Sequence, residues 1–422
     1  MGQLGELGQL GELLRRPIVS AAHPYAGPLA SRIHLLVVQP TPFCNIQCDY
    51  CYLPDRESRA RLAPTVFRQI LERAFASDLV SDQLSVVWHA GEPLALPVDY
   101  YASLFAEIDA LGIPRDRFRH SVQTNALTLN DRWCDFIEEH AIRVGVSIDG
   151  PAFIHDRHRK DRQGRGTHAR ALKGVEILQR RGIDFHVIAV ITADALDHAD
   201  AIFDFFLALG VQRLGFNVEE LEGEHRNSSL ISANFEGHVK AFWQRLYERQ
   251  AASGSRIRIR EFDRAYQSIM AAPSDLTAER AMRTNSQVAP FAIVSVDWQG
   301  NTTSFSPELL GMKDATFADF IFGNVVHAAL LDFRQSAAFQ RMANEIYAGV
   351  KRCASECEYF AYCGGGAPSN KYSENGSFDS TETMYCRTSI QMPIAIVLSD
   401  LERRLGLIGS GSGSSTQAVD PA

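Results

Sequence analysis

Six short hydrophobic runs alternate along the chain with stretches whose apolar residues recur at helical spacing. The runs are HLLVVQ (34–39), LSVVWH (84–89), FRHSVQT (118–124), IRVGVSI (142–148), FHVIAVIT (185–192) and RLGFNVE (213–219). Their length and β-branched content predict strands. The stretches between them predict helices: TVFRQILERAFASDL (65–79), YYASLFAEIDALG (100–112), RWCDFIEEHA (132–141), THARALKGVEILQRRG (167–182) and HADAIFDFFLALG (198–210). Strands alternating with helices indicate an α/β fold with a parallel sheet, and six such units are typical of a partial (β/α)6 barrel.

The pattern changes near residue 230. A long helical stretch, FEGHVKAFWQRLYERQ (235–250), is followed by a predicted hairpin, FAIVSVDWQGNTTSFS (291–306). At the N-terminus GQLGEL occurs twice, and the C-terminus is rich in Gly and Ser, which is typical of a flexible segment. We therefore expect five parts: a leader segment (1–30), a core barrel (31–230), a helical linker (231–285), a smaller second domain (286–400) and a flexible tail (401–422).

Polar residues gather directly after the predicted strands. They are Cys44–Cys51, His89–Pro93, Gln123–Asn125, Ser147–Pro151 and Glu219–Glu220. Active sites of β/α barrels lie at the carboxyl ends of the strands, so these segments are expected to face one site.

Composition narrows the class of protein. The formal net charge is −8 and no broad basic field exists, so nucleic acid is not an expected partner. The longest apolar runs fall far short of the roughly 20 residues that a membrane-spanning helix needs. The N-terminus lacks the basic-then-apolar order of a secretory signal. We expect a cytoplasmic protein with no membrane partner.

The eight cysteines fall into a group of three, a group of four and the single Cys134. In a long chain of this kind, grouped cysteines favour metal or redox chemistry over disulfides. Cys44, Cys48 and Cys51 have the spacing C-x3-C-x2-C. Three thiolates can hold three irons of a four-iron cluster and leave the fourth iron open, which suits a catalytic centre. The alternatives are zinc with a distant fourth ligand, or three cysteines that lie near each other by chance.

The loop PFCNIQCDYCY (42–52) resembles the signature of the radical SAM superfamily. WHAGEP (88–93) is similar to the family's GGEP motif, with Ala90 in place of the first glycine. QTN (123–125), SIDGP (147–151) and HDRHR (155–159) resemble the branch that contains anaerobic sulfatase maturases and other peptide-modifying enzymes. The resemblance covers about residues 35–400.

This resemblance implies S-adenosylmethionine and a 4Fe-4S cluster as cofactors. Cys44, Cys48 and Cys51 would ligate the cluster, and the amino and carboxylate groups of S-adenosylmethionine would chelate the fourth iron. An electron from an external reductant of the flavodoxin or ferredoxin type would then yield a 5′-deoxyadenosyl radical that abstracts a substrate hydrogen. The implied cofactor-binding residues are Tyr50, Gly91, Glu92, Gln123, Asn125, Ser147, Asp149 and Arg159.

Cys353, Cys357, Cys363 and Cys386 lie in a segment similar to the SPASM domain that follows many radical SAM cores. CGGGA ends in Ala367 where the full domain carries a further cysteine. The hairpin stretch has Ser306, and RTNSQVAP (283–290) also lacks a cysteine. These departures imply one auxiliary 4Fe-4S cluster instead of two; structural zinc is the alternative.

The stretch GFNVEELEG (215–223) and the second cysteine segment resemble the cyclophane-forming peptide maturases of the Xye/Grr/Fxs type. That resemblance implies a crosslink between an aromatic ring and a β-carbon in a ribosomal precursor peptide. Glu219, Glu220 and Glu308 are the candidate catalytic bases. Only about 30 residues precede the first strand, so we expect no fused leader-recognition domain.

Two other functions stay open on the sequence. The first is oxidation of a sulfatase Cys or Ser to formylglycine, and the loss of the second auxiliary cluster argues against it. The second is a zinc-binding interaction module without catalysis.

Overall fold

The computed structural model describes residues 32–407 apart from 78, 81, 232–233 and 274. The GQLGEL repeat and most of the Gly/Ser tail lie outside the described residues. Contacts group the described residues into one compact unit.

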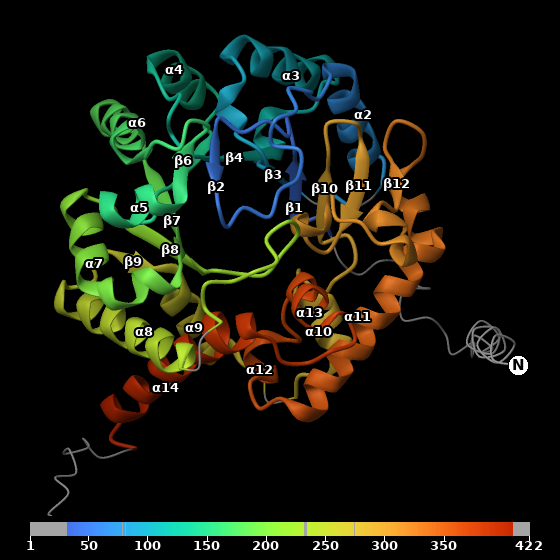
Figure 1. The fold of residues 1–422 in the computed structure, drawn as a ribbon. Helices are drawn as coiled ribbons and strands as arrows, with labels where there is room; N and C mark the ends of the chain where they lie inside the picture. The colour runs from blue at the N-terminus through green and yellow to red at the C-terminus, as the bar shows by residue number, and fades with distance from the viewer. Residues whose placement is uncertain (1–31, 78, 81, 232–233, 274, 408–422) are drawn as a thin grey trace, which may run out of the picture. The chain divides into compact units, whose positions relative to one another are not determined.

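All six predicted strands are present and run parallel. They are β1 (Leu35–Val38), β3 (Leu84–Trp88), β4 (Phe118–Thr124), β5 (Arg143–Ser147), β7 (Phe185–Ile191) and β8 (Arg213–Val218). They lie in chain order within one ten-stranded sheet, β12-β11-β10-β1-β3-β4-β5-β7-β8-β9. The sheet curves into an arc (Figure 1). Among the described residues its two outer strands, β12 (Gly323–Asn324) and β9 (Arg258–Ile259), do not pair with each other, so the barrel is partial, as expected.

Helices cover the outside of this arc (Figure 1). They are α2 (Pro64–Phe75), α3 (Val98–Ala110), α4 (Asp131–Glu139), α6 (His168–Arg181) and α7 (Ala199–Ala208). The fully buried Trp88 lies edge-on to Tyr101 of α3, with ring centroids 5.3 Å apart. Such aromatic contacts between strand and helix add to the apolar area that holds the layers together. Cys134 is fully buried in α4.

A two-stranded ribbon outside the main sheet was not predicted. β2 (Ile46–Cys48) lies within the three-cysteine loop and pairs antiparallel with β6 (Arg159–Asp161), which follows the short helix α5 (Ala152–His158). The pairing sets Cys48 opposite Arg159. Strands of three residues carry no recognisable period, so the sequence pattern alone could not reveal them.

The predicted hairpin is also present, as β10 (Ile293–Val296) and β11 (Asn301–Ser304). β10 pairs parallel with β1, so the hairpin extends the sheet of the core. The predicted domain boundary at 286 stays a prediction.

Helices make up most of the remainder. They are α8 (Phe235–Ala252), α9 (Arg260–Ala271), α10 (Ala278–Thr284), α11 (Ala337–Glu356), α12 (Phe360–Cys363), α13 (Pro368–Asn375) and α14 (Met392–Arg404). α14 continues past 401, the predicted start of the tail. Within the described residues no helix is long and apolar enough to cross a membrane.

Candidate active site

The three-cysteine loop follows β1 and is fixed by its own backbone. The Cys44 amide donates to the Arg56 carbonyl at 3.0 Å, and the Cys51 amide donates to the Cys48 carbonyl at 3.4 Å. Burial, then the charges of Glu92 and Cys51, raise the pKa of Cys44 to about 12. Burial and the neighbouring Cys51 and Cys44 also raise the pKa of Cys48, against the charge of Arg159. The three thiols therefore lie within electrostatic reach of one another.

A buried ion pair supports this loop from the ribbon side. Arg159 donates to Asp149 through Nε (2.9 Å) and Nη2 (3.1 Å), and its Nη1 lies 3.9 Å from the sulfur of Cys48. The Tyr50 hydroxyl donates to the same carboxylate at 2.5 Å. Burial alone would raise the pKa of Asp149, but the charge of Arg159 outweighs it and lowers the pKa. The cofactor contacts implied for Tyr50, Asp149 and Arg159 stay predictions; the structure shows the three bonded to each other.

Gly91 packs directly on the backbone that leads into the cysteine loop. Its φ is +69°, and a Cβ there would come within 2.4 Å of the Thr41 oxygen and 2.7 Å of the Phe43 oxygen. Only glycine meets both conditions without strain. The backbone leading into the cysteine loop therefore leaves no room for a side chain at position 91. This is a second reason for a glycine there, in addition to its implied place near S-adenosylmethionine.

Glu92 joins the ends of neighbouring strands. Its amide donates to the Phe43 carbonyl at 2.7 Å. Its carboxylate accepts from the amide of Leu94 (2.9 Å), the hydroxyl of Thr124 (2.6 Å) and the amide of Asn125 (2.8 Å). Burial raises the pKa of Glu92 to about 7. Through these contacts Glu92 connects the loop after β3 to the loop after β4. Its contact with the cofactor stays a prediction.

The three other implied cofactor residues also meet at strand ends. Gln123 donates to the Ser147 hydroxyl at 2.8 Å, across the β4–β5 pair. Asn125 donates to the Asn45 side-chain oxygen at 2.7 Å, inside the cysteine loop. The strand ends and the cysteine loop therefore form one connected network.

The donor set at the loop fits the implied cluster. Three cysteines in electrostatic contact are the ligand type that iron–sulfur clusters use. Within residues 32–407, the gaps aside, no three His, Cys, Asp or Glu side chains are arranged to hold one metal ion, so the fit rests on the type of ligand. In a cluster, Cys44, Cys48 and Cys51 would each bind a different iron through sulfur.

The second cysteine group draws on three separate elements. Cys353 lies in α11, Cys357 at its end, Cys363 at the end of α12, and Cys386 at the start of a π-helical turn (η7, Cys386–Gln391). Burial, then the charges of Cys386, Cys357 and Cys353, raise the pKa of Cys363 to about 11. The fold therefore brings together four thiols that the sequence spreads over 34 positions, from 353 to 386.

A buried lysine adds to the fit of this second group. Lys371 is 2% exposed, and its ammonium group donates to the sulfur of Cys353 at 3.2 Å. A positive charge beside thiolates offsets part of the negative charge that a four-cysteine site collects. Four cysteines with such a partner fit a closed auxiliary cluster, which would carry electrons instead of binding substrate.

Three carboxylates converge near the cysteine loop; Glu222 is buried, and Glu220 and Glu308 are half-buried. Glu220 follows β8, Glu222 lies two residues on, and Glu308 follows the hairpin. Burial, then the charges of Glu308 and Glu220, raise the pKa of Glu222 well above its ordinary range. Tyr52, whose backbone adjoins Cys51, has its pKa raised by burial and by the charges of Glu308, Cys51, Glu222 and Glu220. The carboxylates, Tyr52 and the cysteine loop thus share one environment.

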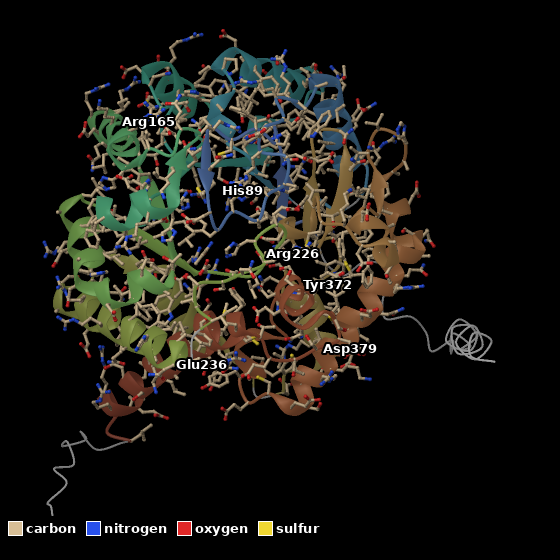
Figure 2. All side chains as sticks on the ribbon, in the orientation of Figure 1. His89, Arg165, Arg226, Glu236, Tyr372 and Asp379 are labelled. Atoms are coloured by element: carbon tan, nitrogen blue, oxygen red, sulfur yellow. The ribbon has the colours of Figure 1, made fainter. Side chains whose placement is uncertain are left out.

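Hydrogen bonds hold two of the three carboxylates in place. Asn370 of α13 donates to Glu220 at 2.8 Å, and Ser306 donates to Glu308. Burial raises the pKa of Glu220 to about 7, against the bond from Asn370. The loop after β8 runs across the opening of the arc (Figure 1), where the Glu224 amide donates to the Tyr52 carbonyl at 3.0 Å. Figure 2 marks Arg226 on this loop and His89 inside the arc.

Glu219 is bonded within its own loop. Its carboxylate accepts from His225 Nε2 (2.9 Å), the Ser228 hydroxyl (3.1 Å) and the Ser229 amide (2.8 Å). These bonds occupy both oxygens of Glu219, whereas Glu220 accepts one bond, from Asn370. Glu222 was not predicted, although it stands in the same acidic run, VEELEG, that pointed to its neighbours.

Comparisons with known proteins place this site in a family. Residues 38–206 match the radical SAM superfamily. An uncharacterised Synechocystis protein, sll1766, is 42% identical over 378 residues, which is 89% of this chain and 93% of that protein. A serine-type anaerobic sulfatase-maturating enzyme of Klebsiella aerogenes is 29% identical over 220 residues, which is 51% of this chain and 54% of that enzyme. The chain belongs to the radical SAM superfamily, whose cofactors are S-adenosylmethionine and a 4Fe-4S cluster.

Solved structures agree on the fold. Native anSMEcpe with bound AdoMet and Cp18Cys peptide matches with a TM-score of 0.71 at 20% identity, covering 89% of this chain and 99% of that one. Streptococcus suis SuiB bound to precursor peptide SuiA matches with a TM-score of 0.61 at 16% identity, covering 90% and 87%. The predicted α/β fold with a parallel sheet and a radical SAM core is thereby confirmed.

Proposed function

We propose that this radical SAM enzyme modifies a ribosomally made peptide, and that it joins an aromatic ring to a β-carbon in that peptide. One observation carries the proposal: Glu220, Glu222 and Glu308 converge beside Tyr52 and the Cys51 side of the cysteine loop. A crosslink of this kind requires both removal of a hydrogen atom and removal of a proton. The site offers residues for both needs within one environment.

The residues have separate roles in this proposal. Cys44, Cys48 and Cys51 would hold the first cluster, and S-adenosylmethionine bound there would supply the radical that takes a hydrogen atom from the substrate. Tyr50, Asp149 and Arg159 hold the loop in position. The hydrogen bond between Thr124 and Glu92 and the bond between Gln123 and Ser147 fix the strand ends around the cysteine loop.

Loss of two hydrogens per crosslink sets the balance of the reaction. One hydrogen leaves the β-carbon as an atom. The new carbon–carbon bond then forms at the ring, and the ring carbon loses its hydrogen as a proton and an electron. We assign the proton to Glu220, because a base whose pKa lies near 7 is both free and strong enough at neutral pH. The four-cysteine site is our candidate for the electron, with an external flavodoxin or ferredoxin as the initial reductant.

Sulfatase maturation is the second candidate. It is favoured by the sequence similarity to the Klebsiella aerogenes enzyme and by the fold shared with anSMEcpe. Formation of formylglycine from Ser also removes two hydrogens; from Cys the same oxidation gives a thioaldehyde, which water converts to the aldehyde with release of hydrogen sulfide. The same carboxylates could accept the proton in either case. The two candidates differ in substrate: one needs an aromatic side chain, the other a Cys or Ser in a sulfatase motif.

Anaerobic co-expression with candidate peptides separates them. One set is small precursors with repeated aromatic-x-x triplets, and the other is a sulfatase motif peptide in its Cys and Ser forms. We expect a mass decrease of two hydrogens per crosslink in the aromatic set, with fragmentation blocked inside the ring. The Glu220→Gln variant should still cleave S-adenosylmethionine but yield little crosslinked product.

The outcomes are distinct. Conversion of the motif peptide alone would overturn the crosslinking proposal and support formylglycine formation. A protein that retains zinc and no iron after anaerobic purification would overturn both and support the non-catalytic module.

A further inference from the structure

Lys371, on α13, is a buried charged residue that has no carboxylate partner. Its side chain is 2% exposed, and its ammonium group donates to the Cys353 sulfur at 3.2 Å. Among the described residues it forms no ion pair with an Asp or a Glu. An ammonium group loses its hydration when it is buried, so it needs an opposite charge nearby. The thiolate of Cys353 is the group that the fold places there to provide it.

The side chain of Lys371 also lies near a second cysteine of the group. A Cβ built on Gly366 would lie 3.8 Å from Cε of Lys371 and 3.6 Å from the sulfur of Cys386. Burial raises the pKa of the Cys386 thiol, and the charge of Lys371 acts against that rise. The ammonium group therefore lies within electrostatic reach of two of the four cysteines.

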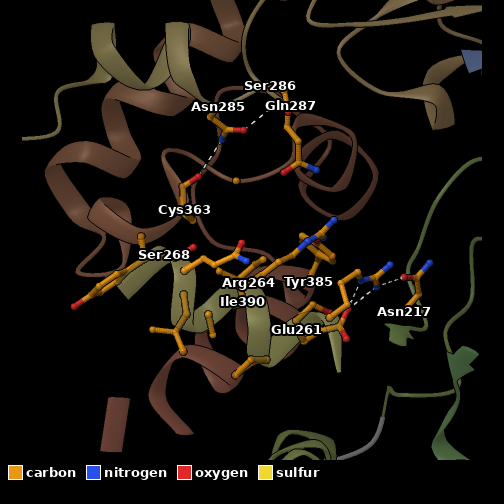
Figure 3. Close-up of a pocket in the computed structure, with 18 of the residues that line it drawn as sticks. Asn217, Glu261, Arg264, Ser268, Asn285, Ser286, Gln287, Cys363, Tyr385 and Ile390 are labelled. Carbon is orange, nitrogen blue, oxygen red and sulfur yellow. Dashed lines mark hydrogen bonds and ion pairs between the residues drawn. The ribbon is translucent and has the colours of Figure 1, made fainter. Parts of the chain in front are cut away.

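The other side of the four-cysteine site is held by neutral contacts. Cys363 lines a cavity of about 520 Å³ between β8, α9, η7 and α14. The Asn285 side chain donates to the Cys363 carbonyl at 3.0 Å (Figure 3). Cys353, by contrast, is buried beside Lys371. The lysine charge acts where the surroundings are driest, so solvent screens it little.

The charges around the first cysteine group differ. Nη1 of Arg159 lies 3.9 Å from the Cys48 sulfur, but Asp149 accepts two bonds from the same guanidinium and offsets its charge. The carboxylates around Tyr52 add negative charge on the Cys51 side. A positive charge beside a cluster favours the reduced form, because that form carries one more negative charge. The second group, with an unopposed cation, should therefore give its cluster the higher reduction potential.

We propose that Lys371 raises the reduction potential of the auxiliary cluster above that of the first cluster, and that it thereby makes the auxiliary cluster the acceptor of the electron that leaves the substrate. The inference rests on the proposed function for the source of that electron. The substrate radical passes one electron to the oxidised auxiliary cluster and one proton to Glu220, and no bond forms at the cluster. Lys371 acts through the cysteine ligands, so it is a positioning residue that places a positive charge beside them.

Redox titration of each cluster by itself tests the proposal without substrate. The full chain with Cys44, Cys48 and Cys51 replaced by Ala keeps only the auxiliary cluster. Its counterpart, with the four cysteines of the second group replaced by Ala, keeps only the first cluster. Both proteins are reconstituted anaerobically, and the EPR signal of the reduced cluster gives each midpoint potential. We expect the auxiliary cluster to have the higher potential.

Substitutions at Lys371 are then made in the protein that keeps only the auxiliary cluster. Lys371→Met should lower the equilibrium constant for reduction by about tenfold, which is a fall of about 59 mV for one electron. Lys371→Arg keeps the charge and should stay near the unsubstituted value. Lys351→Met is the matched control, because Lys351 is exposed on the same helix as Cys353, two residues before it. Solvent screens that charge, so the potential should not change.

If Lys371→Met does not retain about four irons, Lys371→Gln replaces it with the same expectation. An unchanged potential in the neutral variant would overturn the proposal. So would an equal fall in Lys371→Arg, because the charge would then not be the cause. Loss of iron from both neutral variants would show that Lys371 is needed to hold the cluster and does not tune it. An auxiliary potential at or below that of the first cluster, or a site that takes up zinc and gives no EPR signal, would also contradict the proposal.

The acceptor part has its own readout. With both cysteine groups intact, Lys371→Met should cleave S-adenosylmethionine as the wild type does but release less product for each cofactor cleaved. A lowered potential with an unchanged ratio would overturn the assignment of the electron. Failure of the crosslinking assay in the wild type, by contrast, would leave the measured potentials intact.

Discussion

At the residue scale, Glu220 shows how burial makes a carboxylate useful. Its environment combines desolvation, one hydrogen bond from Asn370 and repulsion from Glu308, and the pKa rises from 4.5 to about 7. Because the pKa of Glu220 differs between the folded and the unfolded protein, the free energy of unfolding depends on pH. The contribution of Glu220 to stability is fully present below pH 4.5 and is lost as pH rises through about 7, because the charged form is disfavoured in the folded state.

The rate of peptide modification should therefore rise between about pH 6 and pH 8, as Glu220 becomes ionised. Glu220→Gln should lower product formation by about 10²-fold or more and remove this pH dependence. Single-turnover product formation, with cleavage of S-adenosylmethionine as the internal reference, measures both effects. Glu176→Gln, an exposed change on α6, is the control and should behave as wild type. An unchanged pH profile in Glu220→Gln would assign the base elsewhere.

Gly91 gives a second test at this scale. Gly91→Ala should destabilise the protein and reduce the iron bound at the cysteine loop, because the new Cβ meets the Thr41 and Phe43 oxygens. Gly112→Ala is matched in backbone strain, since its φ is +66° and no atom lies within 4 Å of the added Cβ. The left-handed conformation alone costs about 1–2 kcal/mol. Urea unfolding should show a larger loss for Gly91, and equal losses would show that the close approach does not matter.

At the scale of elements, the β2–β6 ribbon joins the cysteine loop to the barrel. Arg159 lies on β6 and Asp149 follows β5, so their ion pair connects the ribbon to the sheet. The Asp149 carboxylate also accepts from the Val190 amide of β7 at 2.9 Å. One buried carboxylate thus fixes the ribbon, the loop and two strands relative to each other.

Removing Arg159 should be costly, because Asp149 is fully buried and would keep an unpaired charge. We expect Arg159→Met to lower the free energy of unfolding by about 3–5 kcal/mol. The same substitution at Arg132, whose pair with Asp99 is exposed, should cost less than about 1 kcal/mol. Anaerobic urea titration of both variants compares the two costs, and similar values would show that the buried pair has no special part in the fold.

At the scale of the whole described unit, the β10–β11 hairpin joins the chain that forms the second cysteine site to the sheet that carries the first. β10 lies beside β1, which leads into the first site, and the chain after the hairpin forms the second site. The carboxylates come from the β8 loop and the end of the hairpin, and α13 provides the bond to Glu220. In the proposed reaction, this arrangement would let one substrate lose its proton to the carboxylates and its electron to the four-cysteine site.

Iron content tests this arrangement. Two four-iron clusters predict about eight irons per chain after anaerobic reconstitution. The Cys44/Cys48/Cys51→Ala variant and the Cys353/Cys357/Cys363/Cys386→Ala variant should each retain about four. Cys134→Ala changes a buried cysteine outside both groups and should retain about eight. About twelve irons in the wild type would contradict the single auxiliary cluster, and zinc without iron would contradict both sites.

The sequence by itself determined the order of strands and helices. The hydrophobic patterns of strands and helices, with periods of two and 3.6 residues, can be recognised along all six strand–helix units. It also determined the chemistry of the cysteine loop, since three sulfur ligands within eight residues are close in any fold. The tertiary structure alone decided how Glu220, Glu222 and Glu308 meet, and that Glu219 is bonded within its loop. The meeting of the three carboxylates depends on pairings between residues up to 150 positions apart, such as Asn370 with Glu220, which no local pattern encodes.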